Sequence, residues 1–314
     1  MLTEGNETRF MARGAAPVAP ASAGDRTAGA TLTYAHARQS RFRQTLIRCV
    51  ERLSGQPHLV RLYQDWARGV KDENESIFRA ALRLLRIRLE VAGAEHFESV
   101  PASGGLLIIA NHPFGIVDGV TLGFLATQFR TEARILTNSL LCRVPEAEPF
   151  LLPIDFADTP EARRLTAESR RQAVSLLAQG KAVVVFPGGS VATANRPLAA
   201  RAVDPGWHPF VGRLAAQTGV TTLPIYFGGQ NSRLFQIASH WSYPLRVALI
   251  IRETRRMLGK TVQLRIGQPI RAQDLAGLPR DRIAPELRRR TMELAQPGRP
   301  GLDEVFVWPA RIRW

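Results

Sequence analysis

Two short runs of almost purely apolar residues constrain the fold of this chain more than any other feature. Residues 106–110 read Leu-Leu-Ile-Ile-Ala, and residues 182–186 read Ala-Val-Val-Val-Phe. Runs of this length without polar residues are typical of strands that are covered on both faces, as in parallel sheets. Both runs are far shorter than the ~20 residues of a membrane span. They therefore predict a sheet buried between layers of helices.

Predicted strands alternate with predicted helices from residue 93 onward. Further strands are expected at 133–136, 221–227 and 262–266, and helices at 120–129, 159–179 and 210–218. This alternation indicates an α/β fold with a mixed, largely parallel sheet flanked by helices. We assign residues 93–295 to this domain.

The preceding residues, 36–92, show a helical pattern and are expected to form an N-terminal amphipathic helical region. Apolar residues recur at spacings of three or four, and the third predicted helix is marked by Phe78, Leu82, Leu85 and Leu89. Its other side carries Arg79, Arg83, Arg86 and Arg88. Such a helix can lie on an anionic bilayer, or it can cover a core with its charges in water.

The ends of the chain differ in composition from these two regions. Residues 1–35 are rich in Ala, Gly and Pro near their start and are predicted to be a disordered tail. They lack the basic flank and apolar stretch of a secretory signal. Residues 296–314 are predicted to be a C-terminal tail, in which Phe306, Trp308 and Trp314 pack back on the protein or touch lipid.

The charge of the chain is strongly positive, with 42 Lys and Arg against 27 Asp and Glu, a formal net charge of +15. This excess predicts attraction to an anionic polymer or surface, although an Arg- and Ala-rich composition can also reflect base composition. An anionic membrane surface is the expected partner. Nucleic acid is not expected, because no recognised nucleic-acid-binding module is present.

The cysteines and the other potential metal ligands show no pattern of a disulfide framework or a metal site. Cys49 and Cys142 lie far apart, and no group of residues has metal-ligand spacing. We expect a reduced, intracellular setting and neither a metal nor a cofactor.

The segment after the first apolar run carries the strongest chemical signal. Residues 111–115 read Asn-His-Pro-Phe-Gly, and Asp118 follows. His112 can accept a proton near neutral pH, and a carboxylate beside it can fix its tautomer. The two side chains can meet only if Pro113 and Gly115 allow a turn between them. The alternative is a surface histidine in a turn, with Asp118 merely capping the next helix.

Three other segments follow strands or apolar runs in the same way. Residues 186–190 read Phe-Pro-Gly-Gly-Ser, and the backbone N–H groups of such a turn can bind a polarised oxygen. Residues 228–233 end in Asn231, Ser232 and Arg233, where an Arg could bind an anionic group or simply be solvated. Residues 150–155 are an apolar run ending in an acid, suited to an acyl groove or to plain core.

Taken in this order, the blocks resemble the glycerolipid acyltransferase superfamily, which includes the bacterial 1-acylglycerol-3-phosphate acyltransferases. The likeness covers about residues 93–270 and is closest to the hemolysin-like branch, some members of which acylate lyso-ornithine lipid. It rests on four blocks, which are residues 111–118, residues 137–141 (Thr-Asn-Ser-Leu-Leu), residues 207–210 (Trp-His-Pro-Phe) and residues 231–236 (Asn-Ser-Arg-Leu-Phe-Gln).

The resemblance implies a bacterial O-acyltransferase of phospholipid or ornithine-lipid biosynthesis. It would move a fatty acyl chain from acyl carrier protein or acyl-CoA to the hydroxyl of a lyso-lipid. It would act as a peripheral protein on the cytoplasmic face of the inner membrane. The implied general base is His112, oriented by Asp118. The implied substrate-binding residues are Asn111, Pro113, Phe114, Gly115, Asn138, Phe186, Pro187, Gly188, Gly189, Ser190, Asn231 and Arg233.

The sequence departs from the family pattern in three places. Five residues separate His112 from Asp118 instead of four, a spacing that the branch shares. Gly188 stands where the family has a Glu that helps to bind a glycerol-phosphate acceptor, which leaves room for another acceptor. No phosphate-binding Arg of the family's second block is matched near Pro153.

Two alternatives to this enzyme remain. One is a catalytically inactive peripheral lipid-binding protein of the same fold, which the missing acid at Gly188 makes conceivable. The other is a hydrolase with Ser190 or Ser139 as nucleophile, but the chain has no Gly-x-Ser-x-Gly elbow.

Overall fold

A computed structural model describes residues 41–69, 75–295 and 303–308. The predicted disordered tail at residues 1–35 lies outside the described residues, and so does most of the predicted C-terminal tail. Among the residues that the structure describes, no helix is long and apolar enough to cross a membrane.

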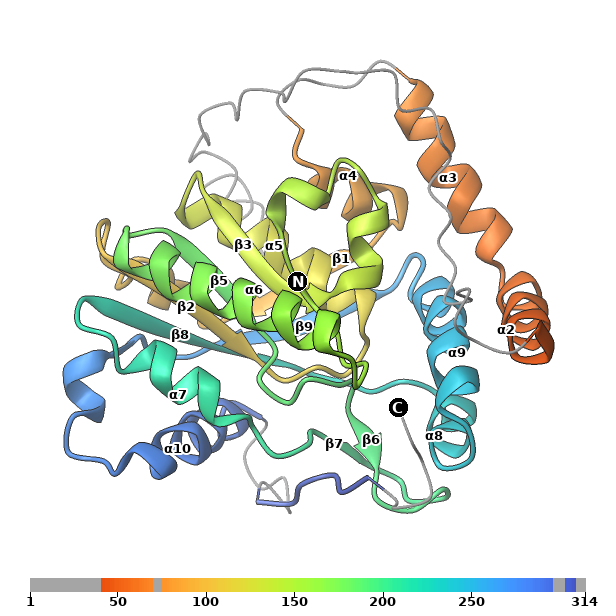
Figure 1. The fold of residues 1–314 in the computed structure, drawn as a ribbon. Helices are drawn as coiled ribbons and strands as arrows, with labels where there is room; N and C mark the ends of the chain where they lie inside the picture. The colour runs from red at the N-terminus through yellow and green to blue at the C-terminus, as the bar shows by residue number, and fades with distance from the viewer. Residues whose placement is uncertain (1–40, 70–74, 296–302, 309–314) are drawn as a thin grey trace.

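The centre of the molecule is a mixed sheet with the strand order β1-β9-β8-β2-β5-β3-β4, and β10 pairs with β8 (Figure 1). The strands are β1 (Arg88–Ala92), β2 (Gly105–Ala110), β3 (Ala133–Asn138), β4 (Leu151–Ile154), β5 (Ala182–Val185), β8 (Val220–Phe227), β9 (Thr261–Ile266) and β10 (Ile270–Arg271). Neighbouring strands are parallel except where β8 meets β9 and β10. The predicted α/β fold with a mixed, largely parallel sheet is confirmed.

Helices cover both faces of this sheet, as its apolar strands require. Along β2, Leu106 and Ile108 belong to one core, and Leu107 and Ile109 belong to the other. One face is packed by α4 (Ile77–Leu84) and α5 (Ile116–Phe129). The opposite face is packed by α6 (Pro160–Ala178), α7 (Pro209–Ala215) and α10 (Arg280–Met292) (Figure 1). Every residue of β2, β5 and β8 is buried.

A separate group of helices lies beside one end of the sheet (Figure 1). It contains α2 (Arg41–Leu53), α3 (Gln56–Arg68), α8 (Arg233–Ser239) and α9 (Tyr243–Arg256). Helix α9 packs against both α2 and α8, and Ile47 of α2 is buried with Ala248 of α9. Helix α9 therefore joins the N-terminal helices to the part of the chain that follows β8.

The third helix predicted from the N-terminal pattern is wrong at its C-terminal end. Helix α4 stops at Leu84, and the predicted helical position Leu89 lies in strand β1. Arg86 adopts a left-handed backbone with φ 51°, which a continuing helix cannot contain. The N–H of Arg88 then donates to the carbonyl of Lys260, 3.0 Å away, and parallel pairing with β9 begins. Pairing with the distant strand β9 therefore makes this segment a strand, and the local spacing of apolar residues does not reveal that pairing.

The described part of the C-terminal tail packs back on the protein. Phe306 is 3% exposed and forms a β-bridge with Pro205. Its ring lies edge-on to His240 and to Trp308, with ring centroids 6.1 and 4.9 Å away. Trp314 lies outside the described residues. Packing, rather than exposure, is thus what the structure shows for Phe306.

Candidate active site

The loops that follow β2, β5 and β8 carry most of the predicted site residues. These three strands are neighbours in the sheet and run parallel, in the order β8-β2-β5. Their carboxyl ends therefore meet at one edge, which is where ligands bind in open α/β sheets. Residues 111–118, 186–192 and 228–232 converge there.

His112 and Asp118 lie face to face at this edge. The Nδ1 atom of His112 is 3.0 Å from Oδ2 of Asp118. Asp118 belongs to the first turn of α5 and is fully buried, and the same Oδ2 accepts hydrogen bonds from the N–H groups of Phe114 and Gly115. Gly115 has φ 90°, a conformation that favours glycine and closes the turn. Asp118 thus both caps the turn and faces the imidazole. The two roles that the sequence suggested for it, capping a helix and orienting a histidine, are compatible in the structure.

The imidazole ring of His112 is held flat against an aromatic side chain. It stacks on Phe186, which follows β5, with ring centroids 4.1 Å apart and 27° between the planes. Because Nδ1 faces Asp118, Nε2 is the ring atom left to exchange a proton. The side chain is 17% exposed, enough to reach a substrate but little enough to be fixed. A histidine with this geometry can act as a general base.

Two buried asparagines at adjacent strand ends have opposite environments. The amide of Asn111 clamps β2 to β8: its Nδ2 donates to the carbonyl of Phe227 and its Oδ1 accepts the N–H of Phe227, at 2.9 and 2.7 Å. Asn231 is 3% exposed, and neither atom of its amide has a hydrogen-bond partner among the described residues. A buried amide without partners is costly, so Asn231 is a candidate donor and acceptor for a bound molecule.

These environments predict different consequences for the same substitution. Asn111→Ala leaves the buried N–H and C=O of Phe227 unpaired and should lower the free energy of unfolding by about 2–4 kcal/mol. Asn231→Ala breaks no amide hydrogen bond among the described residues and should change the free energy of unfolding by less than about 1 kcal/mol. It should instead raise the KM for the acceptor about 3- to 10-fold. Urea unfolding and steady-state kinetics on both variants test this, and equal destabilisation would contradict it.

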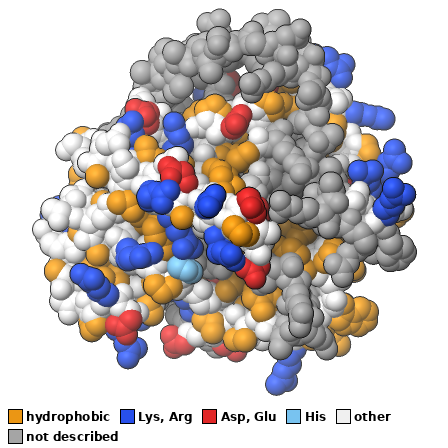
Figure 2. Space-filling model, viewed as in Figure 1, with side chains coloured by type: hydrophobic (Ala, Val, Ile, Leu, Met, Phe, Trp, Pro, Cys, Tyr) orange, Lys and Arg blue, Asp and Glu red, His pale blue; other side chains and the backbone are white. Residues whose placement is uncertain are grey.

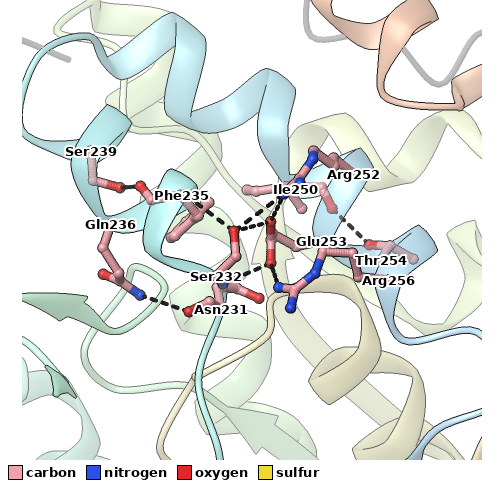
Figure 3. A network of polar contacts seen from close by, with 10 residues as sticks. All are labelled: Asn231, Ser232, Phe235, Gln236, Ser239, Ile250, Arg252, Glu253, Thr254 and Arg256. Atoms are coloured by element: carbon pink, nitrogen blue, oxygen red, sulfur yellow. Dashed lines mark hydrogen bonds and ion pairs between the residues drawn. The ribbon is translucent and has the colours of Figure 1, made fainter. Parts of the chain in front are cut away.

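The residue after Asn231 is fixed by a polar network on α9, drawn in Figure 3. Ser232 caps α8 and gives both its N–H and its hydroxyl to the carboxylate of Glu253, at 2.8 and 2.6 Å. Arg252 and Arg256 pair with the same buried carboxylate, at 2.9 and 2.7 Å. The network holds the loop that carries Asn231 in place. Arg233, the next predicted residue, is exposed at the start of α8.

The turn after β5 is built tightly around its glycines. Gly189 has φ 69°, and its N–H donates to the carbonyl of Phe186 within the turn. No hydrogen bond is found for the N–H of Gly188 or Ser190 within the described part of the chain, so these two remain candidate donors to a substrate oxygen. The Ser190 hydroxyl is buried, also without a partner among those residues.

The space beside Gly188, where the acyltransferases that the sequence resembles have an acid, is narrow. A Cβ atom at this position would lie 3.2 Å from Cδ of Pro205 and 3.4 Å from Oδ2 of Asp204. Asp204 is almost completely buried, and this burial raises its pKa to about 6. The chain therefore places a different carboxylate beside the turn, and a side chain at Gly188 would have to push Pro205 aside by a few tenths of an ångström.

Gly188→Glu should consequently damage the site instead of restoring a family feature. Overpacking against Pro205 costs about 1–3 kcal/mol, and a second carboxylate beside Asp204 adds repulsion. Gly188→Gln, of the same size but neutral, is the matched control and should be the more stable of the two. Denaturant unfolding and activity with lysophosphatidate check both effects. A gain of activity toward lysophosphatidate in Gly188→Glu would contradict this account.

Other predicted residues lie farther away or support the site indirectly. Asn138 ends β3, which is two strands from β2 in the sheet. Pro113 and Phe114 are buried within the turn, and Phe114 fills the space beside Gly229. Pro187 accepts a hydrogen bond from the N–H of His208. Sequence reasoning missed Asp204, whose only signal was its place three residues before the Trp207 block.

Fold and site together define an α/β protein with a histidine–aspartate pair at the carboxyl edge of a mixed sheet. The family model described as Acyltransferase matches residues 74–296, more than half of the chain, and the chain belongs to this family. The prediction of an O-acyltransferase of this superfamily is confirmed.

Two curated relatives share the name lyso-glycine lipid O-acyltransferase. The protein from Phocaeicola vulgatus is 26% identical over 202 residues, covering 61% of this chain and 67% of the relative. The protein from Bacteroides thetaiotaomicron is 26% identical over 162 residues, covering 50% of this chain and 54% of the relative. Among solved structures, the 1-acyl-sn-glycerophosphate acyltransferase PlsC from Thermotoga maritima aligns over 81% of each chain with a TM-score of 0.42 and 16% identity.

Proposed function

We propose that this protein transfers a fatty acyl chain from acyl carrier protein or acyl-CoA to the hydroxyl of a lyso-lipid. The observation that carries the proposal is the His112–Asp118 pair, with 3.0 Å between Nδ1 and Oδ2 at the carboxyl edge of the sheet. The chain that holds this pair belongs to a family of acyltransferases. A catalytically inactive lipid-binding protein would have no need for a base oriented in this way.

The proposed reaction is a direct transfer. Nε2 of His112 removes the proton of the acceptor hydroxyl while that oxygen attacks the thioester carbon. The tetrahedral oxyanion is stabilised by backbone donors such as the N–H groups of Gly188 and Ser190. The carbon–sulfur bond then breaks, the ester is released, and the imidazolium returns its proton to the departing thiolate. No covalent acyl-enzyme is required.

The proposed acceptor is a lyso-lipid with an amino-acid head group. Three observations support this choice over a glycerol phosphate: the names of the two curated relatives, the likeness to the lyso-ornithine lipid branch, and the absence of the acid at Gly188, where Pro205 and Asp204 lie close by. Purified protein incubated with labelled acyl donors and lyso-glycine lipid, lyso-ornithine lipid and lysophosphatidate tests it. Ester formation on the amino-acid lipids supports the proposal, and lipid binding without any transfer would contradict it.

Positive charge over α6 and α7 is a candidate docking surface for the donor, since acyl carrier protein is acidic and CoA carries phosphates. Figure 2 shows Lys and Arg side chains gathered over α6. Arg170 and Arg213 both stack on the ring of Phe210, with Cζ 5.2 and 5.5 Å from its centroid. Both guanidinium groups lower the pKa of His208, after the larger effect of its burial. An anionic donor would relieve this repulsion.

The N-terminal arginines are proposed to hold the protein on an anionic membrane surface. Arg79, Arg86 and Arg88 are exposed, whereas Arg83 pairs with Glu75 at 2.6 Å. Each basic residue near an anionic bilayer contributes about 1 kcal/mol. Replacing the three exposed arginines by Glu should therefore weaken binding to anionic vesicles by at least about 100-fold. Flotation at low and high salt measures this, and salt-independent binding would contradict the proposal.

A further inference from the structure

The segment between β5 and α7 fastens both backbone polar groups of His112. The short hairpin of β6 (Thr193–Ala194) and β7 (Ala202–Val203) lies in this segment. Just before it, the N–H of Ala192 donates to the carbonyl of His112 at 2.7 Å. Just after it, Oδ1 of Asp204 accepts the N–H of His112 at 3.1 Å. The backbone of His112 is thus held from both ends of one hairpin.

Asp204 is itself fixed from several sides. Its second oxygen, Oδ2, accepts the indole N–H of Trp207 at 3.2 Å, and its backbone carbonyl accepts the N–H of Phe306 at 3.0 Å. Arg288 contributes a favourable charge nearby. The carboxylate is almost completely buried, and its hydrogen bond to His112 is made to the backbone N–H and not to the ring.

The rest of the hairpin is tied to α8 and α9, which gives Asp204 a rigid base. The buried guanidinium of Arg246 donates to the hydroxyl of Thr193 and to the carbonyl of Val191, both at 2.6 Å. Gln236 accepts the N–H of Ala194 at 2.9 Å. Residues from two helices therefore fix the first strand of the hairpin.

We propose that Asp204 is a positioning residue that, together with Trp207, sets the backbone of His112 so that its imidazole meets both Asp118 and the substrate. The inference rests on the proposed function for its kinetic readout. Without the Oδ1 contact, the N–H of His112 would lose its acceptor and the ring would shift on Phe186. A misplacement of about 1 Å in a catalytic group can cost about 100-fold in rate.

Two conservative variants test the role of Asp204 without leaving a cavity. Asp204→Asn keeps the shape but offers one acceptor oxygen for two donors, and Trp207→Phe keeps an aromatic ring but removes the indole N–H. Asp65→Asn is the matched control, because that side chain is exposed on α3, away from the site and from α6. Steady-state kinetics give kcat and the KM of the acceptor. Hydrogen exchange in protein labelled with ¹⁵N-histidine reports the backbone N–H of His112 directly, because the chain has only six histidines and few signals overlap.

The expected result for Asp204→Asn is a kcat about 100-fold lower with KM within about threefold, and at least tenfold faster exchange of the His112 N–H. Trp207→Phe should show a smaller change in the same direction, and it decides the question if Asp204→Asn does not fold. A variant with wild-type kcat, or with reduced kcat but unchanged exchange at His112, would overturn the inference. A wild-type protein inactive with every donor and acceptor would instead contradict the proposed function, while the exchange comparison would still test the contact.

Discussion

Replacing His112 by alanine should reduce acyl transfer by at least about 10²–10⁴-fold and leave the fold intact. The substitution removes Nε2, the atom that takes the hydroxyl proton in the proposed reaction. The ring is partly exposed and stacks on Phe186, so its loss should cost little stability. Product formation from a labelled acyl donor, measured alongside thermal unfolding, gives both quantities.

His58→Ala is the appropriate control, because that histidine is exposed on α3. It should retain wild-type activity. If His112→Ala kept more than about a tenth of wild-type activity, the proton of the acceptor would have to be removed by another group.

Changing Asp118 to asparagine should have the second-largest effect, lowering kcat by about 10²–10⁴-fold. The amide oxygen can still accept the N–H groups of Phe114 and Gly115, which now bond to Oδ2. The neutral side chain can no longer stabilise the imidazolium that forms on His112, and its NH₂ group favours the wrong tautomer. The turn should therefore survive while the base fails.

Kinetics at saturating donor measure this loss, and Asp65→Asn is again the exposed control. Full activity in Asp118→Asn would mean that the carboxylate only caps the turn before α5. If the unfolding temperature of Asp118→Asn fell sharply together with its activity, the loss of activity could come from unfolding as well as from lost catalysis. In that case Asp118→Glu, which keeps the charge, should be less active than wild type but more active than Asp118→Asn.

Much of the sheet could be predicted from the sequence because its strands are buried on both faces. Runs such as residues 106–110 contain only apolar residues, and segments with helical spacing of apolar residues lie between these runs in the sequence. The strand at Arg88–Ala92 could not be predicted, since Leu85 and Leu89 also fit a helix and only pairing with β9 decides. Helix α9 was missed for a similar reason. Its buried positions include Arg246 and Glu253, which local patterns assign to solvent.

The candidate site was partly visible in the same way. His112 and Asp118 are close in sequence, and Pro113 and Gly115 indicate the turn that joins them. Asp204 is 92 positions from His112 and acts on its backbone, so no local spacing could reveal it. Asn111 and Asn231 look alike in sequence, and only the contacts of Phe227 separate a structural clamp from a free amide.

The most direct measurement compares wild-type protein and His112→Ala, each mixed with labelled acyl donor and a hydroxylated lyso-lipid and then quenched with acid. Wild type should give esterified lipid with no label on the protein, and His112→Ala should give neither. Esterified lipid from the variant at the wild-type rate, or an acylated protein intermediate in wild type, would contradict direct transfer driven by His112.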